Sequence, residues 1–132
     1  MSLSATASLP PMLITPGQLA AKLKSKQPLC ILDSTWFLNM PNAPVRNAHK
    51  EYLRGPRIPG ALFWDVDAVS TKGDSVMKLP HMMPSGSLFA QAAAAKGISR
   101  DTHVVVYDSH GIFSAPRTAF TFSAFGHKAI YL

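Results

Sequence analysis

Apolar residues follow two different spacings along this chain. Short runs of β-branched, leucine and aromatic side chains, typical of strands buried on both faces, occur at residues 29–32, 61–64, 104–107 and 128–132. Segments with apolar positions at helical spacing stand before and between them, at residues 15–26, 45–53, 85–96 and 115–125. Helices and strands therefore alternate, which predicts an α/β fold: a parallel sheet with helices on both faces.

The signals at helix ends sharpen this prediction. Thr15, Pro16 and Gln18 supply a capping hydroxyl, a proline at the first helical position and a glutamine three residues after the cap. Gly97 and Gly126 are placed to end the third and fourth helices. Residues 1–14, which are rich in Ser, Ala and Pro near the start, are predicted to be a flexible arm, so that the folded domain spans residues 15–132.

One strand leads straight into a reactive type of residue. The apolar run 104–107 is followed at once by Asp108, then by a loop with Gly111 and by a helix start at residues 114–117. Open α/β sheets bind ligands at the carboxyl ends of their strands, and backbone N–H groups at a helix start favour anions. Any chemistry centred here would depend on Asp108, because no cysteine stands at this position.

A second candidate site lies after the strand at 61–64. Asp65 and Asp67 follow this strand directly, and the connection from residue 70 to residue 84 has no clear periodicity. A loop of that length inside a small domain usually has a function. It contains His81, a residue type that can carry a proton near neutral pH.

Composition and charge restrict the function further. The chain has 132 residues, enough for one domain with a core, and 13 Lys and Arg against 7 Asp and Glu give a net charge of +6. The cations are dispersed and no aromatic ladder accompanies them, so the charge suits a small anionic substrate and does not indicate nucleic acid. A single cysteine, Cys30, lies within an apolar run; it excludes an internal disulfide and a CxxC zinc site, and no run is long enough to span a membrane.

Seven short motifs, taken together and in order, resemble a known family. They are similar to the N-terminal half of the tandem rhodanese-type sulfurtransferases, the thiosulfate and 3-mercaptopyruvate sulfurtransferases, from about Thr15 onward. The motifs are Leu32-Asp33-Ser34-Thr35-Trp36, Arg57-Ile58-Pro59-Gly60-Ala61, Asp65-Val66-Asp67, His81-Met82-Met83-Pro84, Val104-Val105-Val106-Tyr107-Asp108, Ser114-Ala115-Pro116-Arg117 and Phe125-Gly126-His127.

The resemblance implies a two-domain enzyme. A cysteine in the C-terminal rhodanese domain would take sulfur from a small anionic donor as a persulfide and pass it to a thiol or to cyanide, with no cofactor or metal. This chain would be the non-catalytic N-terminal domain, without its closing segment, and Asp108 would occupy the inactive nucleophile position. Asp67 and His81 would face the partner domain's cysteine loop as supporting acid–base residues, and the family is cytoplasmic or mitochondrial.

The chain departs from the family pattern in two ways. Arg57 stands where the family usually has His, and the Gly-Gly segment that follows the last strand would lie beyond Leu132.

The domain alone is expected not to transfer sulfur. It is also expected to expose an apolar face and to self-associate, because a surface that packs against a partner domain would be open.

Other interpretations remain open at this stage. The chain could be a stand-alone rhodanese-fold binding or regulatory module, because the cysteine is missing. Asp65 and Asp67 also fit the Asp-x-Asp pattern of haloacid-dehalogenase-like phosphatases, with Asp65 as nucleophile and Mg²⁺ as cofactor. A soft Cu(I) site could form from Met77, His81, Met82 and Met83. Asp67 could simply cap a turn, His81 could be a surface loop residue, and thiosulfate cannot be separated from mercaptopyruvate as the donor.

Overall fold

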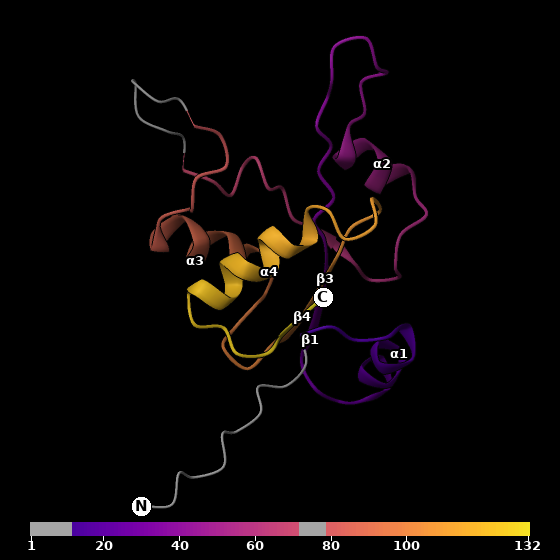
Figure 1. Ribbon diagram of the computed structural model, residues 1–132. Helices are drawn as coiled ribbons and strands as arrows, with labels where there is room; N and C mark the ends of the chain where they lie inside the picture. The colour runs from indigo at the N-terminus through magenta and orange to yellow at the C-terminus, as the bar shows by residue number, and fades with distance from the viewer. Residues whose placement is uncertain (1–11, 72–78) are drawn as a thin grey trace, which may run out of the picture.

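Four parallel strands form the centre of the molecule. The computed structural model describes residues 12–71 and 79–132 (Figure 1). The strands β1 (Leu29–Asp33), β2 (Leu62–Phe63), β3 (His103–Tyr107) and β4 (Ile130–Tyr131) are arranged in the order β2-β1-β3-β4. The helices are α1 (Pro16–Lys24), α2 (Ala48–Arg54), α3 (Gly86–Ala95) and α4 (Ala115–Ala124). The predicted α/β class is confirmed.

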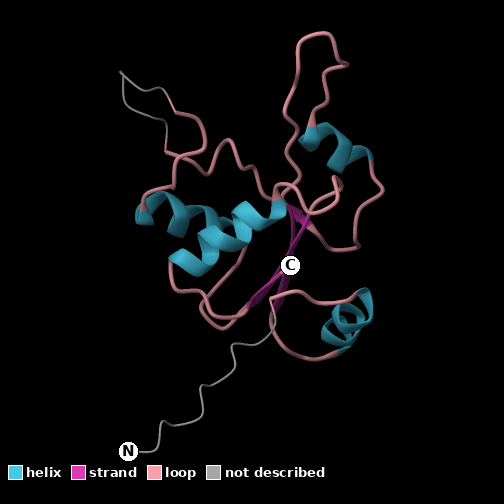
Figure 2. Cartoon of the chain, viewed as in Figure 1, coloured by secondary structure: helices cyan, strands magenta, loops and turns pink. Residues whose placement is uncertain are grey.

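The helices cover both faces of the sheet. Figure 2 shows α3 and α4 on one side and α1 and α2 on the other. Successive side chains of a strand point to opposite faces, so Leu32, Val104 and Val106 pack with Phe122 under α3 and α4, whereas Ile31 and Val105 face the other way, towards α1. Burial on both faces explains why the strands are continuous apolar runs.

The strand register brings the loops after β1, β2 and β3 to the same edge of the sheet, at the carboxyl ends of the strands. Asp33 at the end of β1 pairs with Phe63 of β2 on one side and with Tyr107 of β3 on the other. All four strands pair in parallel, so the loops that begin after these residues start next to one another. The segments that carry Trp36, Asp67 and Asp108 therefore leave the sheet from the same edge.

Element boundaries differ slightly from those predicted. The first helix has the predicted capping box, in which the Gln18 amide donates to Thr15 Oγ1 at 3.1 Å and the Thr15 amide donates to Gln18 Oε1 at 2.8 Å. The helix predicted at 45–53 begins later, because Asn47 caps it by accepting from the Lys50 amide at 2.9 Å. The second and fourth strands are each only two residues long.

The end of the predicted arm is hydrogen-bonded to Leu132, the residue after β4. Residues 1–11 lie outside the described residues, but the Leu132 amide donates to the Met12 carbonyl at 2.7 Å and the Ile14 amide donates to the Leu132 carbonyl at 3.0 Å. The start and the end of the described domain therefore lie side by side. Among the described residues, no helix is both long and apolar enough to span a membrane.

Candidate functional site

Asp67 and His81 form a hydrogen-bonded pair. Asp67 lies in the turn after β2, and His81 lies in the long connection before α3; His81 Nε2 is bonded to Asp67 Oδ1. The Trp36 indole N–H, from the loop after β1, lies 3.2 Å from both Asp67 carboxylate oxygens. The Trp36 ring also meets the His81 ring edge-on, with 4.9 Å between centroids. Three segments distant in sequence thus converge on one carboxylate.

The backbone around His81 is fixed from two sides. Arg117, in the first turn of α4, donates from Nη2 to the His81 carbonyl, and the Thr71 amide donates to the Met82 carbonyl at 3.0 Å. His81 itself has a φ of +57°, an uncommon backbone conformation for a residue other than glycine. These anchors hold the imidazole against Asp67 although residues 79–85 belong to no helix or named strand.

The loop after β3 is built around its own carboxylate. One Asp108 oxygen accepts from the His110 amide at 2.9 Å, and the other accepts from the amides of Phe113, Ser114 and Ala115 at 2.8, 3.0 and 2.8 Å. Burial raises the pKa of the Asp108 carboxyl, but the four backbone donors together outweigh burial and hold its pKa below the usual range. The predicted cradle of N–H groups therefore exists, and Asp108 fills it.

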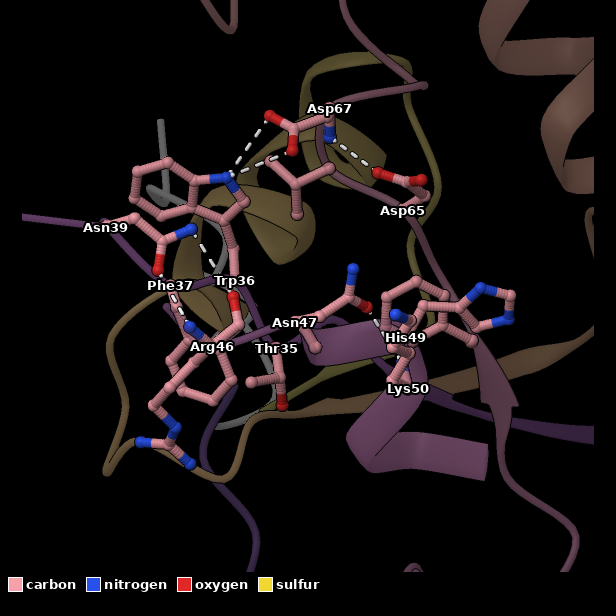
Figure 3. Close-up of a pocket in the computed structure, with 13 residues that line it drawn as sticks. Thr35, Trp36, Phe37, Asn39, Arg46, Asn47, His49, Lys50, Asp65 and Asp67 are labelled. Atoms are coloured by element: carbon pink, nitrogen blue, oxygen red, sulfur yellow. Dashed lines mark hydrogen bonds between the residues drawn. The ribbon is translucent and has the colours of Figure 1, made fainter. Parts of the chain in front are cut away.

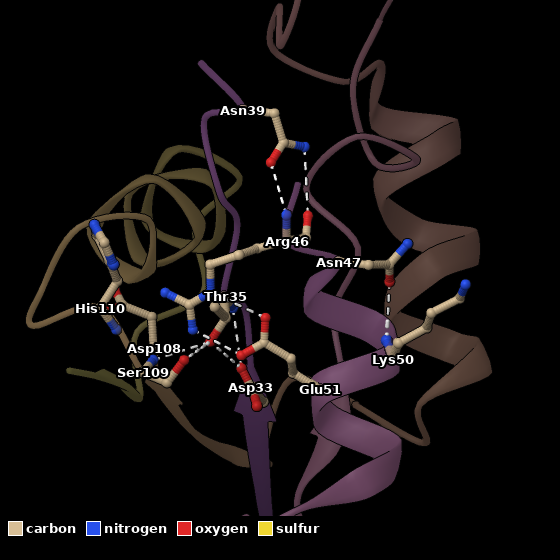
Figure 4. Close-up of polar contacts among 10 residues, drawn as sticks. All are labelled: Asp33, Thr35, Asn39, Arg46, Asn47, Lys50, Glu51, Asp108, Ser109 and His110. Carbon is tan, nitrogen blue, oxygen red and sulfur yellow. Dashed lines mark hydrogen bonds and ion pairs between the residues drawn. The ribbon is translucent and has the colours of Figure 1, made fainter. Parts of the chain in front are cut away.

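Hydroxyl groups join this loop to the one after β1. Ser114 Oγ donates to the Ser34 carbonyl at 2.7 Å and accepts from the Trp36 amide at 3.0 Å. Thr35 Oγ1 accepts from the Ser109 amide at 2.9 Å and donates to the buried Asp33 carboxylate at 2.6 Å (Figure 4). The Asp108 loop thus fixes the backbone that carries Trp36, and through Trp36 it supports the Asp67–His81 pair.

A pocket of about 360 Å³ opens beside Asp67. Figure 3 shows it between the loop after β2, which carries Asp65 and Asp67, and the segment around the start of α2, which carries Asn47, His49 and Lys50. Asp65 Oδ1 accepts from the amides of Asp67 and Ala68 at 2.9 and 3.1 Å and so shapes the turn. Asp67, whose carboxylate is bonded to His81, therefore also lines this pocket.

The structure brings together the residues singled out in the sequence and adds others. Asp67, His81 and Asp108 all belong to one end of the sheet, linked by Trp36. The contacts that Trp36 and Arg117 make with the Asp67–His81 pair were not predicted. The position of Trp36 directly after the polar end of a buried strand was the available signal, since this is where functional side chains of parallel sheets are found.

The alternative chemistries find less support in the geometry. Asp65 uses one oxygen to cap its own turn, and within residues 12–71 and 79–132 no group of three or more His, Cys, Asp or Glu side chains could hold a metal ion. Met77 of the suggested Cu(I) site lies outside the described residues. His110 packs edge-on against Phe37 and Phe113, with centroids 5.7 and 5.0 Å apart, so its ring is engaged with aromatic neighbours.

Apolar side chains near this site are open to solvent. Ile112 is 64% exposed and Phe113, which stacks on Trp36 at 6.4 Å, is 50% exposed. Leu38, Leu79 and Met82, which stand close in sequence to Trp36 and His81, are also exposed. Exposed large apolar residues around a polar pair are typical of a surface that meets another protein or domain.

The fold and these residues define a rhodanese domain. The E. coli protein SseA, solved as a 3-mercaptopyruvate sulfurtransferase with the rhodanese fold, is 34% identical and superimposes with a TM-score of 0.75 over 92% of this chain and 44% of that chain. The sulfur transferase subunit of yeast mitochondrial complex I is 42% identical with a TM-score of 0.78, covering 92% of this chain and 38% of that one.

Sequence comparison places the chain with the rhodanese-type sulfurtransferases. A probable 3-mercaptopyruvate sulfurtransferase of Schizosaccharomyces pombe is 41% identical over 112 residues, and the match covers 84% of this chain but 35% of that protein. The rat 3-mercaptopyruvate sulfurtransferase is 39% identical over 125 residues, with 91% of this chain and 40% of that protein covered. No family model matches the chain. The chain therefore spans well under half the length of these relatives.

Proposed function

We propose that this chain acts as the N-terminal, non-catalytic domain of a two-domain sulfurtransferase. The observation that carries the proposal is the Asp67–His81 pair, held at the carboxyl edge of the sheet beside exposed apolar side chains. The reactive cysteine would come from a second rhodanese domain docked on this edge. The small anionic sulfur donor would bind between the two domains, and a cytoplasmic or mitochondrial location agrees with the mitochondrial yeast relative.

The chemistry of mercaptopyruvate suits a histidine oriented by a carboxylate. The cysteine thiolate of the second domain attacks the donor's sulfur atom, the carbon–sulfur bond breaks, and the enolate of pyruvate leaves with that electron pair. His81 supplies the proton that converts the enolate to pyruvate, and Asp67, which is bonded to His81 Nε2, orients the imidazole. The acceptor thiolate then takes the outer sulfur of the persulfide, which restores the cysteine thiolate.

Asp108 explains why this domain would not carry the nucleophile. Four backbone N–H groups surround one side chain, an arrangement that stabilises an anion. A thiolate there could attack sulfur, whereas a carboxylate gains the same stabilisation without the polarisable atom that the reaction needs. The loop therefore serves to hold the site together.

The experiment uses the two-domain protein with His81→Gln and His81→Ala. General acid–base groups contribute about 10²- to 10⁴-fold, so mercaptopyruvate turnover should fall by about that factor in both variants, while thiosulfate turnover falls less because no carbon takes up a proton. His103→Gln is the matched control, because His103 lies at the opposite, amino end of β3. Equal and small losses with both donors would contradict the acid–base role.

A further inference from the structure

The pocket beside Asp67 carries charges of both signs on facing sides. The turn after β2 contributes the Asp65 and Asp67 carboxylates, and the start of α2 contributes the Lys50 ammonium group together with His49 and the Asn47 amide (Figure 3). Trp36 and Phe63 supply apolar surface within the same pocket. Its volume of about 360 Å³ falls within the range of roughly 300–1,000 Å³ that is usual for small-ligand pockets.

Two of these charged groups have polar atoms that make no hydrogen bond or ion pair within the described residues. Asp65 uses Oδ1 for two backbone amides, and across residues 12–71 and 79–132 its Oδ2 has no hydrogen-bond partner. The Lys50 ammonium group has neither a hydrogen bond nor an ion pair within the same described ranges, although its backbone amide is bonded to Asn47. Arg46, the other cation of the pocket, is already paired with Glu51 at 2.7 Å.

The charges select among ligand classes. A simple anion would meet Lys50 but would lie near two carboxylates, and a simple cation would meet the carboxylates but would lie near Lys50. A zwitterion satisfies both sides at once, and an α-amino acid carries an ammonium and a carboxylate group on one carbon. Complementary charge on both sides gives selectivity even where each exposed contact is weak.

We infer that this pocket binds the amino-acid part of a small thiol, such as cysteine or a cysteine-containing peptide, that accepts sulfur. The inference rests on the proposed function, because it assigns the deprotonation of the acceptor thiol to His81 of the proposed Asp67–His81 acid–base pair. The ammonium group would lie at Asp65 and the carboxylate at Lys50, and the thiol would lie towards Asp67, the residue of the pocket to which His81 is bonded.

The step at this site balances in protons and electrons. The neutral His81 imidazole takes the proton of the acceptor thiol, which creates the thiolate nucleophile. The thiolate attacks the outer sulfur of the persulfide on the partner domain's cysteine, and the sulfur–sulfur bond breaks. The products are the acceptor persulfide and the cysteine thiolate, with the proton left on His81.

Binding can be measured on the 132-residue chain without any turnover. The probes are L-cysteine, 3-mercaptopropionate, which lacks the ammonium group, and cysteamine, which lacks the carboxylate, each under reducing conditions. The Trp36 indole N–H resonance reports on the pocket, because it is bonded to Asp67, and the buried Trp64 indole serves as an internal reference. Cysteine should shift the Trp36 signal saturably and leave Trp64 unchanged, and each truncated thiol should bind about two- to fivefold more weakly.

Two variants test which side chain binds the ammonium group of the thiol and which binds its carboxylate. Asp65→Asn keeps the oxygen that caps the turn, and it should remove the preference for cysteine over mercaptopropionate. Lys50→Gln should remove the preference for cysteine over cysteamine. Lys26→Gln, which changes the same charge before the amino end of β1, is the matched control and should alter neither preference.

Two results would overturn the inference: equal binding of the three thiols, or a Trp36 shift that does not saturate. These outcomes are separate from a failure of the proposed function. Unchanged mercaptopyruvate turnover in the His81 variants would contradict the acid–base role and would leave the binding preferences intact. Absent preferences together with a large His81 effect would contradict the acceptor pocket alone.

Discussion

Two aspartates at the same edge of the sheet are stabilised in opposite ways. Asp108 receives its hydrogen bonds from backbone amides between 2 and 7 residues away in sequence. Asp67 is hydrogen-bonded to the side chains of Trp36 and His81, which are 31 and 14 residues away in sequence. A carboxylate bound by its own loop suits a structural role, whereas one that contacts a partly exposed imidazole suits the proposed chemistry with a partner domain.

The strongest test of this difference removes the Asp108 carboxylate. Asp108→Ala leaves four backbone donors without their acceptor, and unsatisfied donors are costly, so the free energy of unfolding should fall by about 2–3 kcal/mol. Denaturant unfolding of the chain measures the loss. Asp108→Asn keeps one acceptor and should lose less. If Asp67→Ala destabilised the chain as much as Asp108→Ala, the two carboxylates would not differ as described.

A second test acts on the carboxylate that is held by side chains. Trp36→Phe keeps an aromatic ring against His81 but removes the indole hydrogen bond to Asp67, so kcat for mercaptopyruvate in the two-domain protein should fall about tenfold. KM should change little, because the indole N–H is expected to act on Asp67 and not on the donor. A rise in KM at constant kcat would instead place Trp36 in donor binding.

A third test places a thiol where the carboxylate stands. In Asp108→Cys, made on a Cys30→Ser background, the four backbone donors should lower the thiol pKa, and alkylation near pH 6.5 should be several-fold faster than that of Asp101→Cys in an exposed turn. Burial raises the pKa of the Cys30 thiol, so the unmodified chain should react slowly. Equal rates for the two introduced cysteines would show that the cradle does not stabilise a thiolate.

The smallest expected effect is on the pH dependence of stability. The pKa of Asp108 is lower in the folded chain than in the unfolded one, so the carboxylate stabilises the fold above about pH 4, and this contribution is lost as the pH falls through the folded-state pKa. The stability advantage of the wild type over Asp108→Asn should therefore shrink as the pH falls below about pH 5. A constant difference in unfolding free energy would mean that Asp108 does not titrate as its contacts indicate.

Features set by neighbouring residues could be predicted from the sequence, whereas side-chain contacts between residues far apart in the sequence could not. The strand before Asp108, the helix start after it and the capping box at Thr15 are local signals, and all three are present in the structure. The resemblance to sulfurtransferases singled out Asp67 and His81. Trp36 and Arg117 were missed as supporting residues, because no local pattern indicates that an indole meets a carboxylate 31 positions later or that a guanidinium holds the His81 carbonyl.

The hydrogen bonds between Leu132 and residues 12 and 14 also bear on how the domain folds. They join segments separated by almost the whole described chain, and contacts of such long range form late because closing a large loop costs entropy. During synthesis from the N-terminus, the Met12 carbonyl and the Ile14 amide can pair with Leu132 only after residue 132 has been made. We therefore expect this corner of the sheet to form late, and its amides should be among the last to become protected from hydrogen exchange.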